Sequence, residues 1–194
     1  MTPPTRRRAA DAAPDASRRR LLEAAKDVFA EKGYAGARVQ EIADRAGVNK
    51  QLITYYFGGK SGIYAELSRQ WARSEAELQD PELPYDELVL GYLRNVFADP
   101  RGVRLEAWSQ LTGRPDAAEP GAEDLADIER RQAEGELTDA ISPAMVMLLS
   151  QALVMAPHLM PGTVRRIFGS DPADPDFQRN YARQLGLVMR LLRA

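Results

Sequence analysis

Four side chains in one short segment near the N-terminus have the chemistry to read DNA. Lys50, Gln51, Thr54 and Tyr55 lie within residues 49 to 57, a segment that we expect to be helical. Their ammonium, amide, hydroxyl and phenol groups suit base edges and phosphates, and a methyl group or an aromatic ring suits the thymine methyl. We expect all four to point outward from one helix, which would give that helix a face for the major groove.

The surrounding residues predict the element that would position this face. Residues 40 to 60 read QEIADRAGVNKQLITYYFGGK, with helical segments at 39–46 and 49–57 on either side of Gly47. Glycine readily takes the positive φ of a tight turn, and the small Ala43 lets two helices cross closely. The apolar positions that such a crossing would bury are Ile42, Ala46, Val48, Ile53 and Tyr56. This combination predicts a helix-turn-helix, the alternative being an ordinary helical hairpin with one solvated face.

The charges are divided unequally along the chain. The net charge of −2 argues against a nucleic-acid partner until the chain is split at Lys60. Residues 1 to 60 carry 12 Lys and Arg against 7 Asp and Glu, whereas residues 61 to 194 carry 14 against 21. A basic N-terminal part joined to an acidic remainder is expected of a protein that touches DNA with one end only.

The chain divides into four predicted parts. Residues 1–16 are rich in Pro and Ala and carry a cluster of three arginines at 6–8, which predicts a disordered basic arm. Such an arm can enter the minor groove or serve only as a solubilising tail. Residues 17–60 form the predicted DNA-binding domain, residues 61–80 a connecting helix, and residues 81–194 an effector-binding and dimerisation domain.

Helical periodicity predicts an all-α fold. Ser17 is the expected N-cap of a first helix, which carries an apolar stripe and ends at Gly33. The connecting helix begins at Lys60, where free backbone N–H groups and an ammonium could bind a phosphate. Prolines in residues 80–86 predict a connection. Further helices are expected at 85–98, 101–112, 122–135, 142–156 and 174–193, with loops at Pro157 and Pro161. We find no sustained period-two alternation and therefore expect no β-sheet.

Two of the later helices predict a homodimer. Residues 144–156, AMVMLLSQALVMA, are apolar nearly all round but too short to span a membrane. In the last helix, Phe177, Tyr181, Leu185, Val188 and Leu192 form one apolar stripe, and Leu187 and Leu191 begin a second. We therefore expect the helices near 142–156 and 174–193 of two chains to form a four-helix bundle, the alternative being two central core helices of one chain.

The composition also predicts what the protein lacks. The chain has no Cys and one His, His158, for which we expect a structural or exposed role. No Walker loop, zinc motif or nucleophile motif is present, so we expect no enzyme activity, catalytic residue, cofactor or metal. No apolar run reaches the ~20 residues of a membrane span, and the N-terminus has no signal-peptide pattern, so we expect a cytoplasmic protein.

The N-terminal 60 residues resemble the tetracycline-repressor (TetR) family of transcriptional regulators. The strings EIADRAGV, YYF and the following GK carry the resemblance. It implies an all-helical homodimer of about nine helices per chain, which binds a near-palindromic operator in double-stranded DNA. A small apolar effector bound in the C-terminal domain would then shift the DNA-binding domains apart and release the DNA.

The same resemblance implies roles for individual residues. Gln40, Lys50, Gln51 and Thr54 would face bases, Tyr55, Tyr56 and Lys60 would hold phosphates, and Phe57 would be core. The chain departs from the family pattern at Thr54, where Tyr is usual, and at Arg38, which stands where a Thr or Ser cap is common. Arg38 is therefore a candidate phosphate ligand.

The effector site is predicted only by composition. Apolar and aromatic residues that could line a cavity are Trp71, Tyr92, Phe97, Trp108, Met145 and Met147, although such residues at helical spacing are also typical of a plain core. The leading hypothesis is a ligand-responsive repressor. The alternatives are an orphan or architectural DNA-binding protein without an effector, and a helical enzyme that uses carboxylates alone.

Overall fold

The computed structural model describes residues 7–112 and 124–194, and the described residues form helices and no strands. They divide into two compact units. The first unit, which we call the head, contains the described chain up to Ala72 together with residues 105–112. The second unit, the body, contains residues 73–104 and 124–194. The predicted all-α fold is confirmed.

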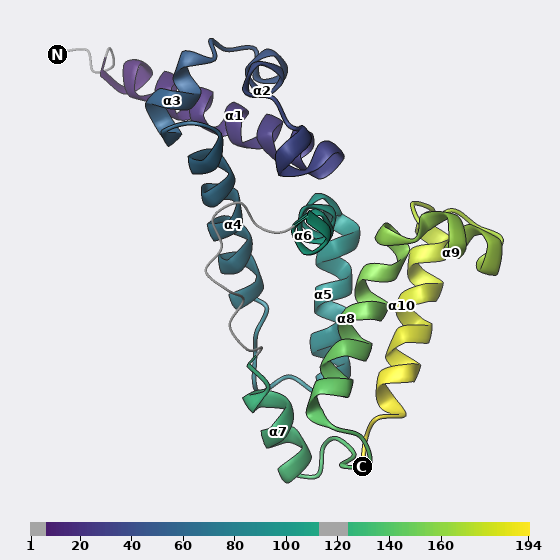
Figure 1. The fold of residues 1–194 in the computed structure, drawn as a ribbon. Coiled ribbons are helices and arrows are strands. Elements are labelled where there is room, and N and C mark those ends of the chain that lie inside the picture. The colour runs from purple at the N-terminus through teal and green to yellow at the C-terminus, as the bar shows by residue number, and fades with distance from the viewer. Residues whose placement is uncertain (1–6, 113–123) are drawn as a thin grey trace, which may run out of the picture. The chain divides into compact units, whose positions relative to one another are not determined.

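The head is built on α1 (Arg7–Gly36), α2 (Val39–Ala46), α3 (Gln51–Phe57) and the first part of α4 (Lys60–Ala76). Figure 1 shows α2 and α3 lying against α1. Buried side chains from each helix meet in one core, which includes Leu21, Ala25, Val28, Phe29, Ile42, Ala43, Ile53, Ile63 and Leu67. The three helices predicted within the DNA-binding domain are therefore present, and α4 completes their core.

The body consists of α5 (Tyr85–Ala98), α7 (Ala126–Ala133), α8 (Pro143–Leu159), α9 (Pro161–Phe168) and α10 (Pro175–Arg190). Helix α5 packs against both α8 and α10, and these three helices run side by side in Figure 1. Their facing side chains form a second core, to which they contribute Tyr85, Leu88, Val89, Leu93, Val146, Val154, Phe177, Tyr181, Leu185 and Met189. Helix α6 (Arg101–Thr112) begins in the body and ends in the head.

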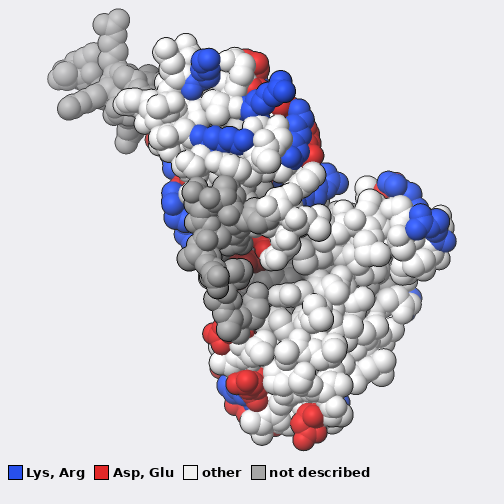
Figure 2. Space-filling view, in the orientation of Figure 1, with Lys and Arg blue, Asp and Glu red and all other residues white. Residues whose placement is uncertain are grey.

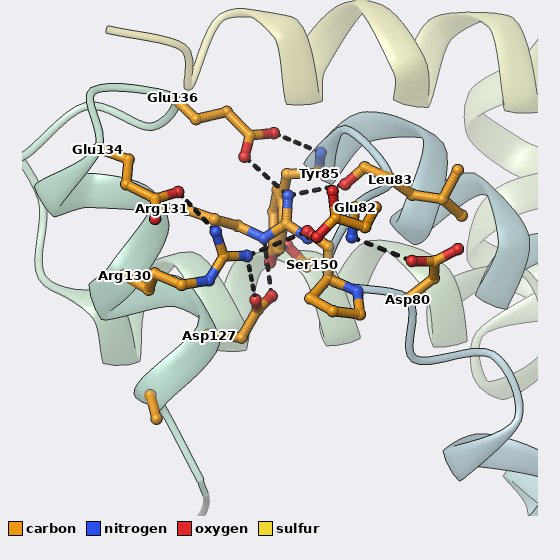
Figure 3. A network of polar contacts seen from close by, with 12 residues as sticks. Asp80, Glu82, Leu83, Tyr85, Asp127, Arg130, Arg131, Glu134, Glu136 and Ser150 are labelled. Atoms are coloured by element: carbon orange, nitrogen blue, oxygen red, sulfur yellow. Dashed lines mark hydrogen bonds and ion pairs between the residues drawn. The ribbon is translucent and has the colours of Figure 1, made fainter.

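A buried arginine fixes the segment before α5 to α7. Arg131 is only 1% exposed, and its guanidinium donates to Asp127 Oδ2 (2.7 Å), Glu136 Oε2 (2.7 Å) and the carbonyl oxygen of Leu83 (2.8 Å). The other oxygen of Glu136 accepts the backbone N–H of Tyr85 at 2.6 Å (Figure 3). Because every partner of this buried charge is polar and close, the network holds the start of α5 in place.

Several expected boundaries are wrong. Helix α1 begins at Arg7, so Ser17 lies inside a helix and is not its N-cap, and the backbone from residue 7 to 16 is helical where we expected disorder. The expectation for residues 1–6 lies outside the described residues. Pro157 does not end a helix, because α8 continues to Leu159, and α9 was not predicted. The described residues contain ten helices, which agrees with the expectation of about nine.

Candidate nucleic-acid interface

The turn between α2 and α3 has the predicted geometry. Gly47 has φ 64°, and its N–H donates to the carbonyl oxygen of Asp44, while the N–H of Val48 donates to Ala43 at 3.1 Å. Ala43 is fully buried where the helices cross. A residue with a side chain is strained at a positive φ, and a larger residue than alanine would separate the helices. The local sequence therefore fixes the angle at which α3 leaves α2.

The outward face of α3 carries the four side chains predicted to read DNA. Lys50, Gln51, Thr54 and Tyr55 are exposed, and Tyr55 is 79% exposed. Asn49, a residue for which we predicted no role, accepts the N–H of Gln51 with its Oδ1 at 2.9 Å. Asparagine before a helix is a common capping residue, and that signal was available in the sequence.

The paired tyrosines do not share one environment. Tyr56 is half-buried and packs against the head core, and its ring meets that of Tyr55 edge to face at 5.0 Å. Phe57 also packs against the head core, as expected, and the guanidinium of Arg18 lies 5.3 Å from its ring centre. Tyr55 is thus the more accessible member of the pair.

Some basic side chains of the head form ion pairs, and others do not. Lys32 donates to Glu41 at 2.7 Å, and Arg45 donates to both Glu31 (2.6 Å) and Glu41 (3.1 Å). The hydrogen bond from Lys32, followed by that from Arg45, lowers the pKa of Glu41 below its ordinary value. Within the described residues, Arg38 and Lys50 form no ion pair. Figure 2 shows Lys and Arg side chains gathered over the head.

Arg38 occupies the N-cap position of α2 but does not cap it. Its backbone is extended, with φ −114° and ψ 133°, and its side chain makes no capping hydrogen bond. The N–H of Ile42 is the first to be bonded within the helix, to the carbonyl oxygen of Arg38 at 3.2 Å. The N-terminus of α2 therefore combines free N–H groups with an unpaired guanidinium, an arrangement that suits a phosphate.

Gln40 and Lys60 are already engaged in the head. The amide of Gln40 donates to Asp44 Oδ1 at 2.8 Å, one turn along α2. The ammonium of Lys60 lies 4.5 Å from the ring centre of Tyr34 and 3.5 Å from the carbonyl oxygen of Ala35, and burial lowers the pKa of Lys60. Lys60 begins α4, as predicted.

Gly62 allows the start of α4 to lie close to the end of α3. A Cβ atom built on Gly62 would lie 1.6 Å from the carbonyl oxygen of Phe57, the last residue of α3. A backbone atom cannot move aside as a flexible side chain can. This glycine could not be recognised from the sequence, because close approach between helices leaves no sign in a single sequence.

The six candidate effector residues are divided between the two units. Trp71 and Trp108 belong to the head, where the Trp108 indole covers Gly33 and its Nε1 donates to the Ala30 carbonyl at 3.3 Å. In the body, Tyr92, Phe97 and Met147 are half-buried against the core, whereas Met145 is 51% exposed. An open cleft of about 700 Å³ on the body is lined instead by residues 81–84, by Arg130 and residues 134–136, and by the C-terminal pair Arg193 and Ala194.

Helix α8 carries apolar side chains on a buried side and on an exposed side. Val146, Ser150 and Val154 are buried, and the opposite side exposes Met145 and Leu148, the latter at 60%. On α10 and the residue after it, the exposed apolar side chains are Leu187, Val188 and Leu191. Val188 was predicted with the inward stripe and faces outward instead; Met189 takes the buried position.

The described residues contain no cluster of three or more His, Asp or Glu side chains that could hold a metal. No single described helix is long and apolar enough to cross a membrane. Helices α8 and α9 together reach the required length and composition, but they are bent by 91°.

Comparison with known proteins places this arrangement in a family. Residues 21–67 match "Bacterial regulatory proteins, tetR family", and residues 86–185 match "Tetracyclin repressor-like, C-terminal domain". The HTH-type transcriptional repressor SCO4008 of Streptomyces coelicolor is 29% identical over 178 residues, which cover 86% of this chain and 91% of that protein. The HTH-type transcriptional regulator RutR of Escherichia coli K12 is 40% identical over 108 residues, which cover 52% of this chain and 50% of RutR.

Solved structures agree with the sequence matches. The crystal structure of the transcriptional regulator SCO4942 from Streptomyces coelicolor has a TM-score of 0.71 and 26% identity to this chain, and the match covers 89% of this chain and 97% of that one. A TetR family regulator from Chloroflexus aurantiacus, at 18% identity and a TM-score of 0.65, shares the fold. The C-terminal sequence match alone spans more than half of the chain, and the N-terminal match covers the helix-turn-helix. The chain therefore belongs to the TetR family of bacterial regulatory proteins, which are DNA-binding regulators of transcription.

Proposed function

We propose that this protein is a homodimeric repressor, which binds a near-palindromic operator and leaves it when a small apolar molecule binds the body. The DNA-binding part of this proposal rests on which basic side chains of the head are ion-paired and which are not. Arg38 and Lys50 are exposed and form no ion pair within the described residues, whereas Lys32 and Arg45 are tied to carboxylates. Free cations beside an exposed polar helix face are what phosphate and base recognition require.

In the proposed complex, α3 enters the major groove. Lys50, Gln51 and Thr54 contact base edges, and Gln40 joins them once its amide exchanges Asp44 for a base. Tyr55, Tyr56 and Lys60 bind phosphates, and Arg38 adds a phosphate contact at the N-terminus of α2. Tyr56 and Lys60 are partly covered in the head, so we expect their contacts to be weaker than that of Arg38.

The second protomer covers the outer faces of α8 and α10. Met145, Leu148, Leu187, Val188 and Leu191 are apolar and exposed, and a two-fold axis would bring the same faces of two chains together as a four-helix bundle. For both recognition helices to enter the groove on one side of the duplex, half-sites must lie about 34–36 Å apart or a multiple of that distance.

Coupling between ligand and DNA requires a route between the units. The chain passes from head to body within α4 and again between body and head within α6, so both connections are helical. A ligand that binds more tightly to one spacing of the two heads than to another would change operator affinity, and DNA would change ligand affinity by the same factor.

The test is the binding of the protein to its own upstream DNA and to random DNA over a range of salt concentrations. A dimer that makes about 6–10 phosphate contacts should lose about three to five decades of affinity between 50 and 200 mM salt. Lys50→Gln should weaken specific binding, whereas Lys32→Gln, the same substitution at a lysine paired with Glu41, should change it little. Equal affinity of the wild-type protein for both DNAs would contradict the proposal.

One observation favours a second candidate, a DNA-binding regulator without an effector. The six candidate effector residues are divided between head and body, and Met145 lies on the exposed side of α8. A small-molecule screen by melting temperature separates the two, because a ligand at a hundred times its dissociation constant adds about 2.7 kcal/mol to the free energy of unfolding. Under either candidate we propose a cytoplasmic, non-enzymatic protein.

A further inference from the structure

His158, the single histidine of the chain, has a buried ring nitrogen without a partner. Its Nε2 makes no hydrogen bond within the described residues, and no other buried side-chain nitrogen or oxygen of the described chain is left unpaired in this way. A buried polar atom without a hydrogen bond destabilises a folded chain, so such an atom calls for a functional explanation. Neither DNA binding nor the proposed dimer interface uses it.

The surroundings of His158 are apolar and aromatic. The residue lies in the last turn of α8, and its ring meets that of Phe97, from α5, edge to face at 5.5 Å. Phe97 lies 6.4 Å from the ring of Tyr181, from α10. The hydroxyl of Tyr181 donates to the carbonyl oxygen of Leu153 at 2.7 Å, so it is already engaged. Of these polar groups, His158 Nε2 is the one that lacks a hydrogen bond.

One cation acts on this histidine. Burial lowers the pKa of His158, and the positive charge of Arg104 in α6 lowers it further, so the imidazole is neutral near pH 7. Arg104 is exposed and forms no ion pair in the described part of the chain. A neutral imidazole can donate from Nε2, and a nearby unpaired guanidinium favours an anion.

We propose that His158 Nε2 and Arg104 bind the carboxylate of an apolar effector, whose hydrocarbon or aromatic part packs against Phe97. This assignment rests on the proposed ligand-responsive function and names the chemical class of the ligand. A carboxylate satisfies the unpaired nitrogen and the unpaired guanidinium together, whereas a neutral apolar molecule satisfies neither.

Binding of a carboxylate is coupled to proton uptake. An anion beside the ring raises the pKa of His158, which is lowered in the free protein. The affinity for the carboxylate should therefore rise as the pH falls from the pKa of His158 in the complex to its pKa in the free protein. The rise should be up to about tenfold per pH unit. The phenol of Tyr181 also lies near Phe97, and burial raises the pKa of Tyr181, so Tyr181 stays neutral between pH 5 and 8.

Because the chain has one histidine, imidazole NMR signals of the full-length protein report on this site alone. The probes are decanoate and 4-phenylbutyrate, each with its neutral alcohol, decanol and 4-phenylbutanol, titrated between pH 5.5 and 8. The carboxylates should raise the pKa of His158, and the alcohols should not. His158→Phe, which keeps an aromatic ring, should weaken carboxylate binding about tenfold or more.

Matched variants separate binding from folding. His158→Phe should melt at the same temperature as the wild-type protein or higher, since it removes an unpaired polar atom, and should keep DNA affinity without a probe. Arg104→Gln should weaken the binding of both carboxylates. Arg183→Gln, at an exposed arginine of α10, should not. If neither carboxylate moves the His158 signals at millimolar concentration, or if the alcohols bind as tightly as the acids, the assignment is wrong.

Operator binding is measured in the same samples without probe. If the protein binds DNA specifically but neither carboxylate shifts the His158 signals, only this assignment is wrong. Loss of specific DNA binding would overturn the proposed function, and the NMR titration would still decide whether His158 binds carboxylates.

Discussion

Replacing Arg38 by serine should stabilise the folded protein and weaken its DNA binding together. Position 38 already has the extended backbone of an N-cap, with φ −114° and ψ 133°, and the first three N–H groups of α2 have no partner within the helix. A serine Oγ can accept the N–H of Gln40 or Glu41, which stabilises a helix by about 1 kcal/mol. Removing a cation from a helix N-terminus adds a few tenths of a kcal/mol, roughly, at an exposed site.

This gain in stability is not offset by the loss of an ion pair, because Arg38 forms none within the described residues. In a chain of this size, about 1 kcal/mol raises the melting temperature by about 2–4 °C. On DNA, the dimer should lose two phosphate contacts, so the slope of log K against log salt should become shallower by about 1.8. Thermal unfolding and salt-dependent operator binding measure the two effects.

Arg38→Ala is the matched control, since it removes the same charge without supplying a cap. It should show the same change in salt slope without the full stabilisation. An Arg38→Ser protein that melts no higher than Arg38→Ala, or that keeps the wild-type salt slope, would refute this reasoning about the N-terminus of α2.

Three further substitutions test other parts of the structure. Arg131→Met should lower the free energy of unfolding by about 3 kcal/mol, measured in urea, because it strands carboxylates that now share a buried guanidinium. Burial would raise the pKa of Asp86, but the guanidinium of Arg193 at 2.7 Å, with a second arginine, lowers it below its ordinary value. The stability that this carboxylate contributes is therefore present above its unfolded pKa of about 3.9 and is lost as the pH falls through its lower folded pKa. Asp86→Asn should therefore flatten the acid limb, which is the fall in the free energy of unfolding with decreasing pH, measured by urea unfolding at a series of pH values. Gly62→Ala should force α4 away from α3, because its Cβ would lie 1.6 Å from the Phe57 carbonyl oxygen, and should reduce operator affinity at least tenfold, roughly, as measured by DNA titration.

Each of these has a control nearby. Arg130→Met changes a more exposed arginine on the same helix and should cost less than Arg131→Met. Asp176→Asn alters an exposed carboxylate whose ion-pair partner, Arg179, is exposed too, and it should change the acid limb less than Asp86→Asn. Ser61→Ala should leave operator affinity near the wild-type value. If a control matches its test variant, the assigned cause is wrong for that site.

The helix-turn-helix could be predicted closely from the sequence because local rules suffice there. The apolar spacing around Ile42 and Ile53 and the turn at Gly47 place α2 at its observed bounds and α3 within two residues of them. The charge asymmetry likewise follows from composition. Which basic side chains are free could not be predicted, because the pairing of Lys32 with Glu41 and of Arg45 with Glu31 depends on how α1 and α2 are rotated toward each other.

Predictions for the body failed where packing overrides local preference. Pro157 usually marks a helix end, yet its ring is buried and α8 continues for two residues beyond it. The short α9 begins at Pro161, a residue that also suits a loop, so the sequence did not distinguish the two. The candidate effector residues were chosen by type, and residue type does not reveal that Trp108 packs on Gly33 within the head. The buried Nε2 of His158 could be found only in three dimensions.

Selection of bound sequences from a random DNA pool tests the central proposal most directly, because it reports binding, symmetry and spacing at once. The wild-type protein should enrich two inverted half-sites whose centres lie about 34–36 Å apart, or a multiple of that distance. Thr54→Ala should change the preferred base at symmetric positions of both half-sites. A pool that shows no enriched sequence, or a single half-site without its inverted copy, would contradict the account of two recognition helices held by one dimer.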